Sequence, residues 1–162
     1  MKRKYILLLL SMCSCFLLFA QDKGNTDIDF VICINGDIAK TIYRPQIVVS
    51  DSESATKSLS ISYHPGSLFL EKADLNYLLS LDDDKKILLK FDYYQQSTKG
   101  EQKVNNYEID MGKEWLRQKF MILYIYDTDR KEYKGKIKPI KGRCYTFELD
   151  YPGGQMIRLR QR

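Results

Sequence analysis

The residues best suited to chemistry in this chain are one histidine and two widely spaced cysteines. His64 lies in a His-Pro-Gly sequence that is typical of a turn. Cys33 and Cys144 are distant from it, and the sequence has no Gly-x-Ser-x-Gly elbow, glycine-rich phosphate loop or zinc-ligand spacing. A nucleophile needs a base beside it, and no pattern indicates such a pair. We therefore expect a non-catalytic protein with no cofactor and no metal site.

Two acidic clusters, at residues 82–84 and at Asp127 with Asp129, offer oxygen ligands of the kind that Ca²⁺ prefers. Neither cluster has the spacing of a calcium loop, so we interpret both as solvated turn residues. The carboxylate pair of a glycoside hydrolase leaves no local sequence pattern. A glycan-active enzyme is therefore kept only as an alternative.

The N-terminus has the features of a secretory signal peptide. Lys2, Arg3 and Lys4 precede an apolar segment, residues 5–20, that ends in Ala20. This segment is shorter than the roughly 20 apolar residues that cross a bilayer. We expect cleavage after Ala20 and export to the periplasm or cell envelope of a Gram-negative bacterium. The mature chain would then not be an integral membrane protein, and an uncleaved anchor is the alternative.

Cys13 and Cys15 lie inside the apolar segment and raise a second alternative. A bacterial lipoprotein signal ends in a small residue before a cysteine that becomes lipidated. Ser14 precedes Cys15, which fits this pattern, whereas the bulky Met12 precedes Cys13. Free cysteine behaves as a small apolar residue, so we interpret both as part of the apolar segment. A lipoprotein anchored through Cys15 or Cys13 remains the alternative.

Length and composition indicate one folded domain. The 162 residues less the predicted signal peptide, residues 1–20, leave 142, an ordinary size for a domain. Apolar residues make up 44% and charged residues 29%, a globular rather than a disordered composition. We expect a flexible mature N-terminus, residues 21–26, and a single domain, residues 27–162.

Charge is distributed unevenly along the mature chain. Residues 21–129 contain 13 basic and 18 acidic residues, whereas residues 130–162 contain 10 basic and 3 acidic. Such asymmetry marks interaction faces, and an exported protein meets protein or glycan partners rather than nucleic acid. For the lysines we favour a solvated edge strand, where lysines prevent edge-to-edge association. The C-terminal arginines can be partly neutralised by acids of the neighbouring strand. A binding surface is the alternative for both sets. The candidate binding surface comprises Lys134, Lys136, Lys138, Arg158, Arg160 and Arg162.

Period-two alternation of apolar residues dominates the sequence and predicts about eight short strands. One hairpin is predicted from residues 75–81 and 87–93, with Leu81 opposite Ile87. A C-terminal hairpin is predicted around Pro152, with a three- or five-residue loop that keeps its apolar residues on one face. The alternating sets include Ile28, Phe30, Ile32 and Ile34; Leu59, Ile61 and Tyr63; and Tyr145, Phe147, Leu149 and Tyr151.

Three other segments complete the secondary-structure prediction. Residues 120–126, FMILYIY, are apolar on both faces, which is typical of a strand covered on both sides. Residues 112–119 contain the one predicted helical turn. Lys134, Lys136 and Lys138 alternate with smaller residues, which predicts an exposed edge strand.

These elements predict an all-β fold. Short strands with frequent turns favour an antiparallel β-sandwich, immunoglobulin-like or a related Greek key, with a lipocalin-like β-barrel as the alternative. Cys33 and Cys144 lie on the first and next-to-last predicted strands, and we predict a disulfide between them because export favours pairing. The predicted function is a binding or structural module of the cell envelope. A β-barrel carrier of a small apolar ligand is the alternative.

Overall fold

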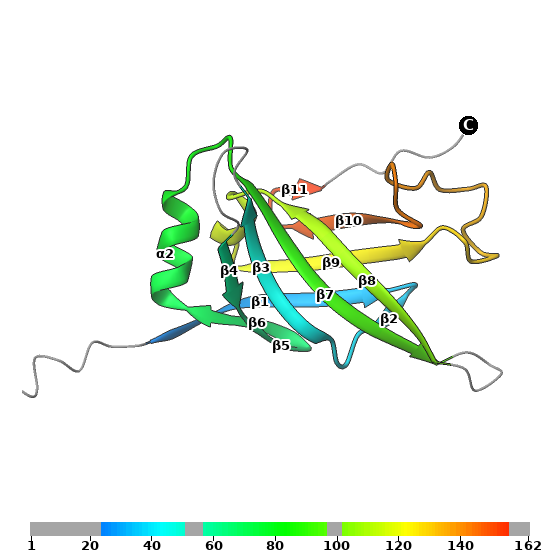
Figure 1. The fold of residues 1–162 in the computed structure, drawn as a ribbon, viewed down its shortest axis with the longest axis horizontal. Coiled ribbons are helices and arrows are strands. Elements are labelled where there is room, and N and C mark those ends of the chain that lie inside the picture. The colour runs from blue at the N-terminus through cyan, green and yellow to red at the C-terminus, as the bar shows by residue number, and fades with distance from the viewer. Residues whose placement is uncertain (1–23, 51–56, 97–101, 156–162) are drawn as a thin grey trace, which may run out of the picture.

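A computed structural model describes residues 24–50, 57–96 and 102–155, and within them the chain is mostly β-strand (Figure 1). The predicted signal peptide lies outside these residues. The first strand begins at Asn25, slightly before the domain start predicted at residue 27. The elements are β1 (Asn25–Ile34), β2 (Asp37–Ile38), β3 (Tyr43–Ser50), β4 (Lys57–Ser60), β5 (Ser62–His64), β6 (Gly66–Glu71), α2 (Lys72–Ser80), β7 (Lys86–Gln96), β8 (Gln102–Met111), η1 (Trp115–Arg117), β9 (Phe120–Asp127), β10 (Tyr145–Tyr151) and β11 (Gly154–Gln155).

The strands form two sheets, here called sheet A and sheet B. Sheet A has the order β11-β10-β9-β1-β6-β5, with β2 beside β1, and sheet B has the order β4-β3-β7-β8. Neighbouring described strands are antiparallel, except that β1 and β9 run parallel. An all-β protein of two antiparallel-rich sheets is therefore confirmed, with one parallel pair that a purely antiparallel sandwich lacks.

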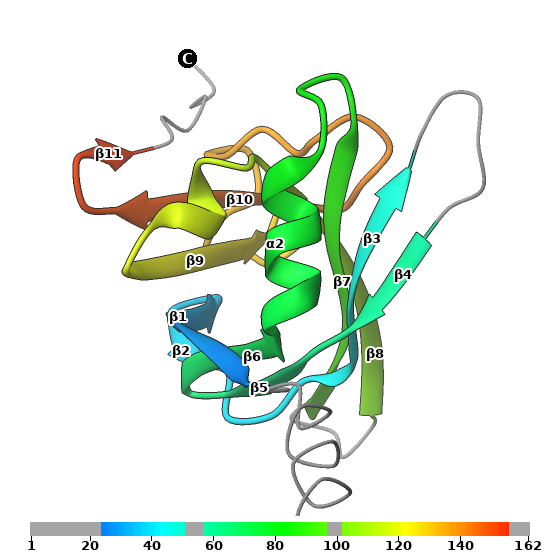
Figure 2. The same ribbon diagram turned by 90° about the vertical axis from the view of Figure 1, so that its left-hand side faces the viewer.

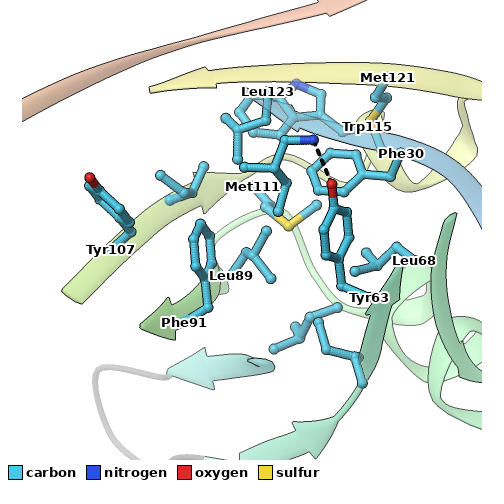
Figure 3. Close-up of a cluster of buried hydrophobic side chains, with 14 of the residues drawn as sticks. Phe30, Tyr63, Leu68, Leu89, Phe91, Tyr107, Met111, Trp115, Met121 and Leu123 are labelled. Carbon is cyan, nitrogen blue, oxygen red and sulfur yellow. Dashed lines mark hydrogen bonds between the residues drawn. The ribbon is translucent and has the colours of Figure 1, made fainter. Parts of the chain in front are cut away.

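The core lies between the two sheets, because alternate residues of each strand point inward. In β1 the predicted inward set, from Ile28 to Ile34, is buried. Figure 3 shows side chains of both sheets meeting, with the Tyr63 hydroxyl accepting a hydrogen bond from the Ile32 amide at 3.1 Å. The largest fully buried side chains are Tyr107, Phe30, Ile32, Ile47, Leu68, Leu78, Leu89, Ile109, Met121, Leu123, Ile125 and Leu149.

The two sheets are joined differently at their two sides. On one side the chain passes directly from β4 to β5 through the buried Ile61. On the other side, side chains bridge β10 to the edge of β8. The Tyr145 hydroxyl accepts a hydrogen bond from the Glu108 amide at 2.7 Å and donates to the Glu108 carbonyl at 2.9 Å. The Arg143 guanidinium donates to the same carbonyl. These contacts satisfy backbone groups that an edge strand would otherwise expose.

Residues 72–80 form helix α2, so the hairpin predicted from residues 75–81 and 87–93 is wrong. Leu75, Leu78 and Leu79 have the i, i+3, i+4 spacing of a helix, which coexists here with period-two alternation. The helix buries Leu78 completely, a residue that the strand prediction placed on the outer face. Figure 2 shows α2 lying across one end of the space between the sheets.

Strand β7 pairs with β8 and β3 instead. Ile87 lies opposite Met111, and the pairing continues to Gln96 opposite Gln102. Strand β7 extends to Gln96 and β8 begins at Gln102, and residues 97–101 between them lie outside the described part. The helical turn predicted after Gly112 is confirmed as η1.

Two C-terminal predictions are also wrong. Lys134 and Lys136 lie in consecutive turns, and Lys138 follows them, within the long connection between β9 and β10 rather than on an edge strand. The loop between β10 and β11 has two residues, Pro152 and Gly153, because Tyr151 pairs with Gly154. Gly153 has a φ of 87°, which suits so tight a turn.

The disulfide predicted between Cys33 and Cys144 is not present, and both cysteines are unpaired. Cys33 lies opposite Tyr124 on one side of β9. The Cys144 carbonyl accepts a hydrogen bond from the Thr128 amide on the other side of β9, at 2.9 Å. Four residues along a strand span about 13 Å, and a disulfide needs Cα atoms within about 7 Å. The strand order therefore separates the two thiols.

Candidate functional site

A pocket of about 550 Å³ lies at the end of the sandwich where sheet B approaches β10. The start of β7 and the end of β8 meet there, because Ile87 pairs with Met111. The chain then turns through Gly112 into η1, which closes one side. The lining residues are Asp83, Lys85, Lys86, Ile87, Asp110, Met111, Gly112, Lys113, Glu114, Trp115 and Phe147.

The floor of this pocket is apolar. Ile87, Met111, Trp115 and Phe147 line it, and all four side chains are buried. Met111 and Trp115 also belong to the buried cluster drawn in Figure 3, so the pocket reaches down to the core. Trp115 is the single tryptophan of the chain, which makes it a specific reporter of this site.

Lysine side chains stand above the floor. The Lys113 ammonium donates to the Leu81 carbonyl and forms an ion pair with the Asp83 carboxylate at 2.7 Å. The Lys113 side chain is 20% exposed, whereas that of Asp83 is 94% exposed. The hydrogen bond from Lys113 and its positive charge lower the pKa of Asp83. The sheltered cation is therefore paired with an acid that stands in solvent.

Two further lysines continue the rim of the pocket. Lys85 lies 3.7 Å from the exposed Asp84 carboxylate, and Lys86 lies 3.2 Å from Asp110. The Lys85 side chain is 22% exposed and that of Asp84 72% exposed, which repeats the arrangement at Lys113. Exposed ion pairs of this kind contribute roughly 0–1 kcal/mol each. An incoming anion can replace such a partner at little cost.

A second pocket, of about 260 Å³, lies on the outer face of sheet B, and its polar groups are bound to one another. The Asp92 carboxylate accepts from the Arg44 guanidinium at 2.5 Å and from the Asn106 amide. Lys90 donates to Glu108 at 2.6 Å. Because these groups already satisfy each other, this pocket is the weaker candidate.

A buried polar cluster ties β9 to the β1–β2 turn. The Asp127 carboxylate, 4% exposed, accepts from Asn35 at 2.7 Å and from the Tyr107 hydroxyl at 2.8 Å. Burial and the neighbouring carboxylate strongly raise the pKa of Tyr107. Asn35 has a φ of 56° in the tight turn. Asp127 is thus a buried structural residue and not the solvated turn acid predicted from sequence.

The residues predicted to form a binding surface lie elsewhere. Lys134, Lys136 and Lys138 are all exposed in the connection between β9 and β10 and do not line either pocket. Arg158, Arg160 and Arg162 lie outside the described residues. His64 is exposed on β5, with its ring 5.9 Å from that of Phe69. In the described segments no group of three His, Cys, Asp or Glu side chains could hold a metal ion.

Sequence reasoning missed the pocket because its parts are far apart in the chain. Residues 82–86 were assigned to a hairpin turn, and Lys113 and Trp115 to a separate helical turn. Only the pairing of β7 with β8 brings Lys85 and Lys113 together. A cluster of lysines at the start of one strand and directly after another was the available signal.

The fold and the pocket define a two-sheet all-β protein with a candidate small-molecule site at one end of the sandwich. Comparison of the chain with protein-family models, curated proteins and solved structures finds no match. Across residues 24–50, 57–96 and 102–155, no helix has the length and apolar character needed to cross a membrane.

Proposed function

We propose that this protein is an exported, non-catalytic binding protein that holds a small amphipathic anion in the pocket between β7, β8, η1 and β10. The observation that carries the proposal is an apolar floor containing Trp115 beneath sheltered lysines with solvent-exposed partners. The volume of the pocket lies within the range found for small-molecule sites in proteins. Such sites often lie at the mouths of β-barrels. Export rests on the predicted signal peptide.

The arrangement favours an anionic head group and an apolar body. A carboxylate that replaces Asp83 at Lys113 retains the charge-assisted hydrogen bond, and the ligand body covers Trp115 and Met111. Burial of such a body contributes about 25 cal/mol per Å² of apolar surface removed from water. Lys85 and Lys86 supply further positive charge at the same rim. The proposal therefore combines the predicted binding module with the predicted carrier of an apolar ligand.

Titration of Trp115 fluorescence tests the proposal, with octanoate as the probe and octylamine as a probe of equal body and opposite charge. We expect saturable binding of octanoate and much weaker binding of octylamine. Replacing Lys113→Met should weaken octanoate binding by roughly 10- to 100-fold, the value of one charged hydrogen bond. Lys40→Met, at an exposed lysine that does not line the pocket, is the matched control.

Two outcomes would contradict the proposal. If neither probe changes the emission of Trp115 saturably, the pocket does not bind amphipathic molecules. If octylamine binds as tightly as octanoate, the lysines do not select an anion. Thermal melting of each variant checks that a change in binding does not result from unfolding.

A further inference from the structure

The outer face of sheet A, here called the A-face, carries a continuous set of apolar side chains. In the sheet register Ile38 lies beside Cys33 and Cys33 beside Tyr124, while Val31 lies beside Ile122. Residues directly opposite on paired strands share a face, so these rows lie side by side. The members of this set are Val31, Cys33, Ile38, Phe120, Ile122, Tyr124 and Tyr126, while Phe69 lies apart from them beside Asp27.

No described element of the chain covers the centre of this face. Ile38 is 55% exposed and Phe120 41% exposed, while Val31 and Ile122 are half-buried. Figure 2 shows α2 and sheet B on the opposite, inner side of sheet A. Contiguous apolar surface of this kind marks an interaction site. Residues 120–126 of β9 are apolar on both faces of the sheet. A partner bound to the A-face would explain this composition, because it would cover the outer face as the core covers the inner one.

The ends of the A-face carry opposite charge. At the end where β1 begins, Asp27, Asp29 and Glu71 are exposed. Two half-buried acids of β10 lie nearer the centre, Asp150 beside Ile122 and Glu148 beside Tyr124, and Glu148 accepts a hydrogen bond from the Tyr126 hydroxyl at 3.2 Å. The described strand residues of the A-face include no lysine or arginine. At the other end the β9–β10 connection, residues 128–144, has seven basic and two acidic residues. It is anchored over the A-face by Tyr133, whose ring lies 5.2 Å from that of Tyr126.

We propose that the A-face binds a second copy of this chain. A twofold axis that lies in the interface and runs across the strands reverses the strand direction of the partner. The acidic end of each copy then faces the lysine-rich connection of the other, and the apolar centres cover each other. An axis along the strands places like charges together. The surface is therefore complementary to itself in one orientation, as a twofold dimer requires.

This dimer uses the lysines that sequence analysis selected, although they lie on a connection and not on a strand. Lys134, Lys136 and Lys138 are exposed beside Tyr133 and can reach acids of the partner. The pocket is separate, because Phe147 lines it from the inner face of β10. Ligand binding and dimer formation are therefore independent, and octanoate affinity should not change on dilution of the protein. Failure of one proposal leaves the other standing.

Sedimentation velocity of the protein over a dilution series tests the dimer. We expect a concentration-dependent species of twice the chain mass. Ile38→Lys with Phe120→Lys places charge in the apolar centre and should raise the dimer Kd by about 100-fold. Val104→Lys is the matched control, because Val104 is 45% exposed on sheet B. A monomer at every concentration would overturn the proposal, as would equal effects of the control and the double variant.

Charge reversal tests the orientation. One variant carries Asp27→Lys and Asp29→Lys, and the other carries Lys134→Glu and Lys136→Glu. Each alone brings like charges together across the interface and should be mostly monomeric. An equimolar mixture should restore the dimer as a heterodimer, because both charge contacts become complementary again. If the mixture associates no better than the separate variants, the strands do not run in opposite directions and the proposed dimer is wrong.

Discussion

The outer faces of the two sheets differ in how their side chains find partners. On sheet B, charged residues pair across neighbouring strands, as Lys86 does with Asp110 and Lys90 with Glu108. On sheet A, the corresponding positions of β1 and β9 hold apolar residues such as Val31 and Ile122. The inner faces of both sheets are alike, because both are buried in one core. The comparison indicates that the charged outer face of sheet B is suited to contact with water, whereas the apolar outer face of sheet A is suited to contact with another protein surface.

One contact on the outer face of sheet B depends on an unusual backbone conformation. Arg44 has a φ of 48°, at the irregularity in the pairing of β3 with β7. This conformation costs a non-glycine residue roughly 1–2 kcal/mol. It lets the exposed guanidinium reach Asp92, whose side chain is 8% exposed. The polar surface of sheet B is thus maintained by specific contacts, and its disruption should be measurable as lost stability.

The largest expected effect on sheet B comes from leaving Asp92 without partners. Arg44→Ala with Asn106→Ala removes both donors to a buried carboxylate, and we expect a loss of about 2–3 kcal/mol in the free energy of unfolding. Urea denaturation measures it. Adding Asp92→Ala should recover part of the loss. If the triple variant is less stable than the double variant, Asp92 acts through packing rather than through its charge.

A smaller effect is expected where β10 closes the edge of β8. Tyr145→Phe removes the hydroxyl that binds both the amide and the carbonyl of Glu108, at a cost of about 1–2 kcal/mol. The control is Tyr151→Phe, at a half-buried tyrosine six residues further along β10. Urea denaturation of both variants makes the comparison. Equal stability of the two variants would show that the hydroxyl bridge does not hold the sheets together.

The smallest effect is the pH dependence of the Lys90–Glu108 pair. The hydrogen bond from Lys90 and the charges of Lys90 and Arg143 lower the pKa of Glu108. Because the folded pKa lies below the unfolded one, the stabilisation is present above the unfolded value and is lost as pH falls through the folded value. The Glu108 side chain is 42% exposed, so solvent screening keeps the effect below about 1 kcal/mol.

Urea midpoints measured on the acid side of neutrality check this sign. We expect Glu108→Gln to flatten the fall in stability between the two pKa values, while leaving the other carboxylates to titrate as before. Lys90→Met should act in the same direction, because it removes the largest cause of the shift. A steeper fall in either variant would contradict the assignment.

Some elements of this fold could be predicted from sequence and others could not. Alternation located strands correctly where one face is core and the other is not, as in β1 and in the set beginning at Tyr145. It failed at α2, where Leu75, Tyr77 and Leu79 alternate but Leu78 completes a helical stripe. A short apolar segment satisfies both periods, and only packing across the end of the sheets distinguishes them.

The pocket could not be predicted from local sequence patterns, for a different reason. Lys85 and Lys113 become neighbours only through long-range pairing of β7 with β8, which replaced the predicted hairpin. The disulfide prediction was wrong because it also depended on long-range strand order. Strand β9 lies between β1, which contains Cys33, and β10, which follows Cys144. Residues 120–126 do form a strand between β10 and β1 in sheet A, but the cover on both faces predicted from their composition is not seen among the described residues, where Phe120 is 41% exposed.

Peptide-resolved alkylation of the two cysteines at increasing protein concentration tests the central contrast most directly. Cys33 lies on the A-face, where burial raises its pKa, and Cys144 is exposed beyond the edge of that face. Cys144 belongs to the connection that faces the partner's acids, so the control is the variant Ile38→Lys with Phe120→Lys, which should not associate. We predict that the alkylation rate of Cys33 falls as the concentration of the unaltered protein rises and stays constant in that double variant. A Cys33 rate that is independent of concentration would show that the A-face remains open to solvent and would contradict the account.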